Sequence, residues 1–137
     1  MTVVADTGAL YALVDASDAW HARVVAWWRA QSSVVVVPAA VLPEVCYLLQ
    51  TRIGTAAELA FVQAVAEEEF TMEWGEPEDL TRAASLIDRY ADLPLGFVDA
   101  TIVAVAERLE TRAILTTDRR HFSVVRPRHA RSFTLLP

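Results

Sequence analysis

The sequence contains no lysine, and all twelve of its basic residues are arginines. It has a single cysteine, Cys46, so it has neither an internal disulfide nor the cysteine spacing of a zinc site. This cysteine usage is typical of a reducing, cytoplasmic setting. No apolar run reaches the length of a membrane span, and no basic stretch followed by an apolar core marks a signal peptide. We therefore expect neither a disulfide-stabilised protein nor a membrane protein.

Length and composition indicate one folded unit. The chain has 137 residues, of which 54% are hydrophobic and 22% charged, and we expect a single domain over residues 1–137. The net charge of −6 is unevenly distributed: residues 1–110 hold six arginines and seventeen acids, and residues 111–137 hold six arginines and one acid. An arginine-rich segment can mark an edge that faces a polyanion, although basic tails are also often just solvated.

Short apolar strands alternate with helices along the chain. Strands are predicted at residues 2–5, 34–37, 70–73 and 113–116, with an edge strand at 123–125 or 133–136. Helices are predicted to begin near Gly8, Ser17, Ala39, Thr55, Pro77 and Gly96, with capping-box spacing at Thr55. This alternation indicates an α/β fold with a parallel sheet covered on both faces. In such sheets ligands bind beyond the carboxyl ends of the strands.

Four acids stand at positions where a carboxylate has little structural reason to be. Asp6 and Asp118 end apolar runs, and Glu44 and Asp99 interrupt apolar stretches. A buried carboxylate is costly unless it is paired or binds a metal, and the chain has no lysine to pair with it. Two of these acids follow strands and two lie in the first turns of later helices. We therefore expect all four to meet at one edge of the sheet.

Each acid has a simpler explanation when it is considered alone. Asp6 is also a good cap for the helix that follows it, and Asp118 is also an ordinary turn residue. Glu44 and Asp99 have apolar neighbours three and four residues away, which is a poor fit to a solvated helix face. The four acids together are far more informative than any one of them.

Converging carboxylates without a histidine or cysteine partner form a hard-oxygen site. Such a site suits Mg²⁺ or Mn²⁺ rather than zinc. These ions bridge substrate phosphates, generate hydroxide from water and stabilise charge on a leaving oxygen. The hydroxyls of Thr7, Thr116 and Thr117 are placed to hold metal-bound waters.

Other candidate functional residues have weaker support. Arg119, Arg120 and His121 adjoin Asp118, and they either contact a phosphate or belong to a solvated loop. The tryptophans of residues 20–28 are most simply core or interface residues of an amphipathic helix, with stacking on bases as the alternative.

Four segments resemble, in order and spacing, a PIN-domain nuclease, and more closely a VapC-type toxin of a bacterial toxin–antitoxin pair. The resemblance covers essentially the whole chain, and the third and fourth segments are its most specific parts. The segments are residues 3–8 (Val-Val-Ala-Asp-Thr-Gly), 38–45 around Leu-Pro-Glu-Val, 93–100 (Leu-Pro-Leu-Gly-Phe-Val-Asp-Ala) and 114–122 (Ile-Leu-Thr-Thr-Asp-Arg-Arg-His-Phe).

The resemblance implies a three-layer α/β/α fold with about five strands and a Mg²⁺- or Mn²⁺-dependent endoribonuclease. It also implies hydrolysis without a covalent intermediate, homodimerisation, and inhibition by a cognate antitoxin. The family's acidic quartet falls on Asp6, Glu44, Asp99 and Asp118, and the hydroxyl residue of its last motif falls on Thr116. Gly8 departs from the pattern, because the family often has serine or asparagine there. We predict Arg119 and Arg120 as RNA-binding residues; the RNA target, the number of metal ions and the antitoxin stay open.

Three rival functions are weighed against this one. A receiver-type phosphoacceptor domain needs a lysine in its acidic pocket, and the chain has none. A small α/β phosphatase of the haloacid-dehalogenase type needs a second aspartate two residues after Asp6, where Gly8 stands. A catalytically inert interaction module that keeps the PIN fold has no need for all four acids.

Overall fold

The computed structural model describes all 137 residues, and its five strands form one sheet in the order β3-β2-β1-β4-β5. Every neighbouring pair is parallel, with β1 between β2 and β4 at the centre. The sheet is therefore parallel throughout, as the sequence predicted. The strands are β1 (Thr2–Ala5), β2 (Val34–Pro38), β3 (Thr71–Glu73), β4 (Ala113–Leu115) and β5 (Thr134–Leu136).

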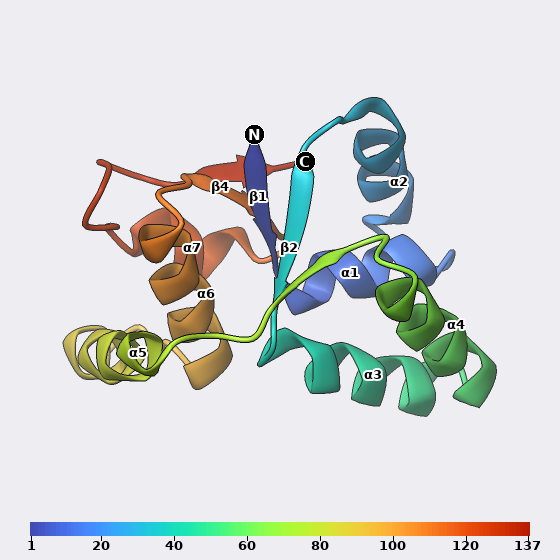
Figure 1. The fold of residues 1–137 in the computed structure, drawn as a ribbon, viewed down its shortest axis with the longest axis horizontal. Coiled ribbons are helices and arrows are strands. Elements are labelled where there is room, and N and C mark those ends of the chain that lie inside the picture. The colour runs from blue at the N-terminus through green and yellow to red at the C-terminus, as the bar shows by residue number, and fades with distance from the viewer.

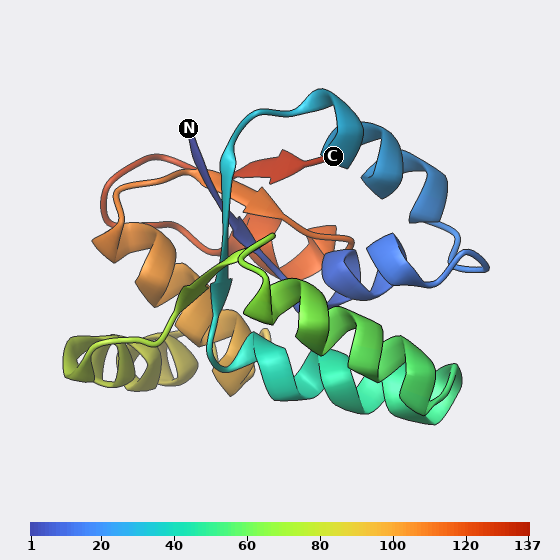
Figure 2. The ribbon, with the colours of Figure 1, turned by 45° about the vertical axis from the view of Figure 1, so that its right-hand side comes forward.

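Seven helices complete the three-layer α/β/α fold that the resemblance implied. Helices α1 to α4 gather on one side of the sheet and α5 and α6 on the other (Figures 1 and 2). Helix α7 packs beside β5. None of the helices is long and apolar enough to cross a membrane. The helices are α1 (Thr7–Val14), α2 (His21–Ala30), α3 (Val41–Arg52), α4 (Thr55–Ala66), α5 (Pro77–Arg89), α6 (Phe97–Arg108) and α7 (Arg119–Val124).

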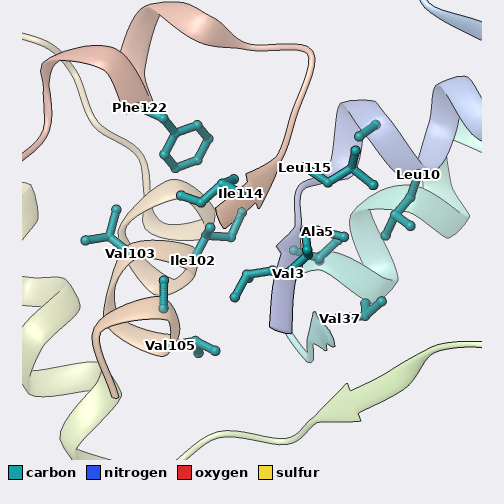
Figure 3. Packing of buried hydrophobic residues seen from close by; sticks show 14 of the residues in the cluster. Val3, Ala5, Leu10, Val37, Ile102, Val103, Val105, Ile114, Leu115 and Phe122 are labelled. Atoms are coloured by element: carbon teal, nitrogen blue, oxygen red, sulfur yellow. The ribbon is translucent and has the colours of Figure 1, made fainter. Parts of the chain in front are cut away.

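The central strands are apolar along their length because helices cover both faces of the sheet. Ile114 and Leu115 are adjacent in β4 and point to opposite faces, and both are wholly buried. Figure 3 shows Ile114 beside Phe122 and helix α6, and Leu115 beside Leu10 of α1. This core on both faces holds β1 and β4 side by side. Their carboxyl ends therefore lie at the same edge of the sheet, where Asp6 and Asp118 follow.

Two local predictions are wrong, and one that left two alternatives open is decided. Helix α2 begins at His21 and not near Ser17, because Asp15 and Asp18 accept backbone hydrogen bonds and form turns before it. Helix α4 does begin at Thr55, but its cap is Gly54, whose φ of 146° suits glycine, and no side chain caps it. Residues 119–124 form α7, so the edge strand is the alternative at the C-terminal end, β5.

An ionic cluster ties α5 and β3 to α6. The Arg108 guanidinium donates to both carboxylate oxygens of Asp79, at 2.9 and 3.0 Å, and to Glu73 at 2.8 Å. Asp79 is buried, and one of its oxygens also accepts the backbone N–H of Glu76 at the start of α5. The buried charge is thus paired and hydrogen-bonded, which is the condition under which burial is tolerated.

Candidate metal centre

Asp6 and Thr116 meet because they follow two neighbouring parallel strands. The backbone N–H of Asp6 donates to the carbonyl of Leu115 at 2.9 Å, which extends the β1–β4 ladder by one residue. One carboxylate oxygen of Asp6 accepts the N–H of Thr7 at 2.7 Å, and the other accepts the Thr116 hydroxyl at 2.9 Å. Asp6 therefore caps α1, as the simpler explanation proposed, and also lies in the acidic cluster.

Thr116 joins Asp6 to Asp118. Its hydroxyl oxygen accepts the backbone N–H of Asp118 at 2.9 Å while the hydroxyl hydrogen faces Asp6. Thr116 is wholly buried, so this hydroxyl has no access to bulk water. Asp118 in turn caps α7, because its side chain accepts the N–H of Arg120 at 3.1 Å. One buried hydroxyl therefore sets the spacing of two of the four predicted acids.

The two other threonines of the predicted site have different surroundings. The Thr117 hydroxyl lies so close to Gly8 that a Cβ at position 8 would collide with it. Glycine at this position is therefore matched to a hydroxyl supplied by another segment. The Thr7 hydroxyl is buried and has no hydrogen-bond partner in the protein. A buried hydroxyl without a partner is costly, and an ordered water beside the acids would satisfy it.

His121 connects Asp99 with Asp118. Its Nδ1 lies 2.8 Å from Asp99 Oδ2 and 3.3 Å from Asp118 Oδ2. One ligand atom from each of these three residues lies within 4.8 Å of the other two. The expectation that the acids have no histidine partner is therefore wrong. The spacing of three residues between Asp118 and His121 was the available signal, because it places two side chains on one face of a helix.

Glu44 lies at the rim of the cluster. It lies in the first turn of α3, and its side chain is exposed and makes no hydrogen bond. The prediction that its apolar neighbours bury it is wrong, because Val41 and Val45 turn into the core while Glu44 turns out of it. Its charge nevertheless reaches Asp99, whose pKa it helps to raise. The structure thus brings Asp6, Asp99 and Asp118 together and leaves Glu44 beside them.

The electrostatics of the cluster disfavour full ionisation. The pKa of Asp6 is raised from 3.8 to about 7, mainly by burial and then by the charge of Asp99, against the opposing hydrogen bonds from Thr116 and Thr7. The pKa of Asp99 is also raised, mainly by burial, with contributions from Asp118 and Glu44, while His121 acts in the opposite direction. A bound cation reverses this balance, because it favours the charged carboxylates.

The two predicted RNA-binding arginines differ in whether their guanidinium groups already have partners in the protein. Arg119 donates to the backbone carbonyl of Pro137 at 2.6 Å, and its guanidinium lies 5.4 Å from the centre of the Trp20 ring. Arg23 lies 4.9 Å from the same ring. Arg120 is exposed, and its side chain makes no hydrogen bond or ion pair in the protein. Trp20 therefore lies beside Arg119, the residue that follows Asp118, and its sequence position did not reveal this contact.

The donor set fits a divalent cation. Carboxylates from the end of β1, from α6 and from the start of α7 lie near one another and near an imidazole. Asp6 and Asp99 resist ionisation in the absence of a cation, and the Thr7 hydroxyl lacks a partner. Buried carboxylates that repel one another are stabilised by a metal ion more effectively than by hydrogen bonds alone. A divalent cation held by these mainly oxygen donors would polarise water and phosphate oxygens.

Comparison with known proteins places this site in a family. Residues 3–126 match the model of the PIN domain. Over 135 residues the chain is 37% identical to ribonuclease VapC26 of Mycobacterium tuberculosis, covering 98% of this chain and all of that protein.

Two solved structures share the fold. The crystal structure of M. tuberculosis VapC20, a toxin that cleaves the sarcin–ricin loop, matches 85% of this chain and 90% of its own, with a TM-score of 0.79 and 27% identity. FitAcB from Neisseria gonorrhoeae matches 85% of this chain and 87% of its own, with a TM-score of 0.59 and 18% identity, and supports the fold alone. With a family match over most of its length and a VapC ribonuclease as a full-length relative, this chain belongs to the PIN-domain family and is of the VapC type.

Proposed function

We propose that this chain is a metal-dependent endoribonuclease and the toxin of a toxin–antitoxin pair. The observation that carries the proposal is that Asp99 and Asp118 cluster with His121 and that Asp6 lies near enough for the charges of both to raise its pKa. Burial and mutual repulsion keep Asp6 and Asp99 from ionising freely. Such a cluster is unfavourable for the fold by itself, so it indicates a ligand that compensates for the charge.

Asp6, Asp99 and Asp118 would hold Mg²⁺ or Mn²⁺, with Glu44 at the open side. When bound, the ion would polarise a water for attack on phosphorus and offset charge on the leaving oxygen. Thr116 would hold the Asp6 carboxylate beside the backbone of Asp118, because its buried hydroxyl donates to Asp6 and accepts the Asp118 N–H. The exposed Glu44 carboxylate is free to accept a proton or a hydrogen bond from water at the rim.

Arginines would hold the RNA backbone beside the acids. Arg120 is the strongest candidate, because its guanidinium is exposed and unpaired next to Asp118. Arg119 and Arg23 both lie over the Trp20 ring, which orients two positive charges along one edge of the site. Phosphate contacts from arginine fix the register of the backbone and carry no base specificity by themselves.

We further propose that residues 1–137 act as one PIN domain in the cytoplasm, as a homodimer inhibited by an antitoxin protein. The VapC type of the chain supports these proposals. The sarcin–ricin loop cleaved by VapC20 is the first RNA to be assayed, because that protein is 27% identical and shares the fold. An inert interaction module is the remaining alternative, and it is disfavoured because all four acids are present and three of them converge.

The test is cleavage of a sarcin–ricin stem-loop and of total RNA with Mg²⁺, Mn²⁺ or EDTA. The parent should cleave only with metal. Asp99→Asn should lower the rate by at least about a hundredfold, since the metal supplies several kcal/mol of charge stabilisation in the transition state. Asp92→Asn is the matched control, because Asp92 is an exposed acid in the segment before α6 that makes no hydrogen bond.

Two results would contradict the proposal. Cleavage at the parent's rate by Asp99→Asn would place the reaction elsewhere. A folded parent that cleaves neither RNA with either metal would favour the inert module.

A further inference from the structure

We infer that His121 is a nitrogen ligand of the bound cation, together with Asp99 and Asp118. This inference rests on the proposed function and adds to it the donor type and the metal preference of the site. His121 lies outside the acidic quartet that the family resemblance places on this chain. It carries an imidazole into a site that the sequence presents as oxygen-only.

The distances fit ligands that share one ion. Adjacent ligands of an octahedral ion with bonds of roughly 2.0–2.2 Å lie about 2.8–3.1 Å apart. Nδ1 of His121 is 2.8 Å from Asp99 Oδ2 and 3.3 Å from Asp118 Oδ2, so both separations are close to this edge length. The ligand atoms of all three residues lie within 4.8 Å of one another, so they are close enough to share one cation.

The local fold holds His121 in this position. Asp118 is the cap of α7 and His121 lies three residues later in its first turn, so both side chains reach the same side of the helix start, where they are 3.3 Å apart. A carboxylate and a histidine at this spacing ligate the metals of carboxylate-bridged helical bundles. Phe122, the next residue, is almost wholly buried in the core and anchors the short helix. Asp99 approaches from α6, so two elements supply the three ligands.

The other histidines have different partners. His21 Nδ1 bonds to the Ala12 carbonyl at 2.7 Å, and His129 Nε2 bonds to the Thr111 carbonyl at 2.8 Å. Each of these rings is hydrogen-bonded to a backbone carbonyl, whereas the His121 ring contacts two carboxylates. His121 is therefore the one histidine oriented toward the acids.

A nitrogen ligand changes which metal the site prefers. Mg²⁺ favours oxygen ligands and keeps several waters, whereas affinity for nitrogen donors rises along the transition series from Mn²⁺. The oxygen-only site predicted from the sequence would discriminate weakly between Mg²⁺ and Mn²⁺. With His121 as a ligand, the site should prefer Mn²⁺ or a later divalent transition ion over Mg²⁺.

The experiment detects the Mn²⁺–nitrogen bond directly. Protein labelled with ¹⁵N-histidine is loaded with Mn²⁺ and examined by pulsed electron paramagnetic resonance for hyperfine coupling to nitrogen. The parent and the control variant His21→Gln should show histidine coupling, and His121→Gln should lose it. Equilibrium titration should show Mn²⁺ affinity at least about tenfold weaker in His121→Gln, with a smaller change for Mg²⁺.

The outcomes separate this inference from the proposed function. Bound Mn²⁺ without histidine coupling in the parent overturns the inference and leaves an oxygen-ligated nuclease. Tighter Mn²⁺ binding in His121→Gln also overturns it, because the imidazole would then compete with the cation for the acids. Absence of both Mn²⁺ binding and RNA cleavage in the parent overturns the inference and the proposed function together. The spectrum of the parent is decisive by itself if His121→Gln fails to fold.

Discussion

Replacing Asp6 with asparagine should make the metal-free protein more stable, and increasingly so as the pH rises. Asparagine keeps the shape and retains an oxygen for the N–H of Thr7, and its amide nitrogen can donate to the Thr116 hydroxyl. The pKa of Asp6 is about 7 in the folded protein against an ordinary 3.8. Between these values the folded state binds a proton that the unfolded state has lost. The free energy of unfolding of the parent therefore falls as the pH rises through this window.

The size of the effect follows from the shift. One pKa unit corresponds to about 1.4 kcal/mol, so ionising Asp6 in the folded protein costs the parent about 4 kcal/mol by pH 8. About 1.7 kcal/mol of this is already present at pH 5, because the unfolded aspartate is mostly ionised there. Asp6→Asn avoids the whole cost. Its advantage over the parent should therefore grow by about 2–3 kcal/mol between pH 5 and pH 8.

Urea unfolding in EDTA at pH 5, 6, 7 and 8 measures this advantage. Asp92→Asn serves as the control, because it removes the same charge at an exposed position and should follow the parent at every pH. A constant difference between Asp6→Asn and the parent across this range would refute the reasoning. Saturating Mg²⁺ or Mn²⁺ should then stabilise the parent by about 3 kcal/mol at a hundredfold excess over its dissociation constant, and the variant by much less.

Two further predictions concern arginines. RNA affinity is measured against salt concentration in the Asp99→Asn background, which blocks cleavage. Arg120→Gln should reduce the steepness of log affinity against log salt by about 0.7, and Arg119→Gln by less, because Arg119 is already bonded to the Pro137 carbonyl. Equal slopes for the parent and Arg120→Gln would show that the RNA backbone binds elsewhere. Arg108→Met should lower the free energy of unfolding by about 2–3 kcal/mol, because it leaves the buried Asp79 unpaired. A loss below about 1 kcal/mol in urea unfolding would contradict this.

The order and type of the main elements were predictable from the sequence. Strands buried on both faces appear as uninterrupted apolar runs, which is why residues 2–5 and 113–115 were found within one residue of their bounds. The convergence of Asp6 and Thr116 also follows from the sequence, because parallel neighbouring strands end at the same edge. What the sequence supplied, therefore, was the topology and the part of the site that depends on it.

Features that depend on packing between distant segments were not predictable. Periodicity places Glu44 among apolar residues but does not show on which side the helix meets the core, and the carboxylate is exposed. His121 and Asp99 are 22 residues apart, and their contact depends on how α7 and α6 settle around Phe122. The same holds for Arg119 and Trp20, which meet only because the segment after β4 folds back toward the start of α2.

The net charge of −6 does not oppose the binding of RNA, because electrostatic attraction is decided locally. At physiological salt the screening length is about 8 Å, so acids farther than this from the site contribute little to the field that a bound phosphate experiences. Within the site, a bound cation would offset the carboxylates, and Arg120 is exposed two residues after Asp118 with its charge unpaired. Arg119 and Arg23 lie within 6 Å of one tryptophan ring, so their positive charge is concentrated at the same edge. If the proposed function holds, the arginine-rich end of the chain would act through Arg119 and Arg120, its two arginines next to Asp118. The local distribution of charge would then decide which edge faces RNA, and the total charge would not.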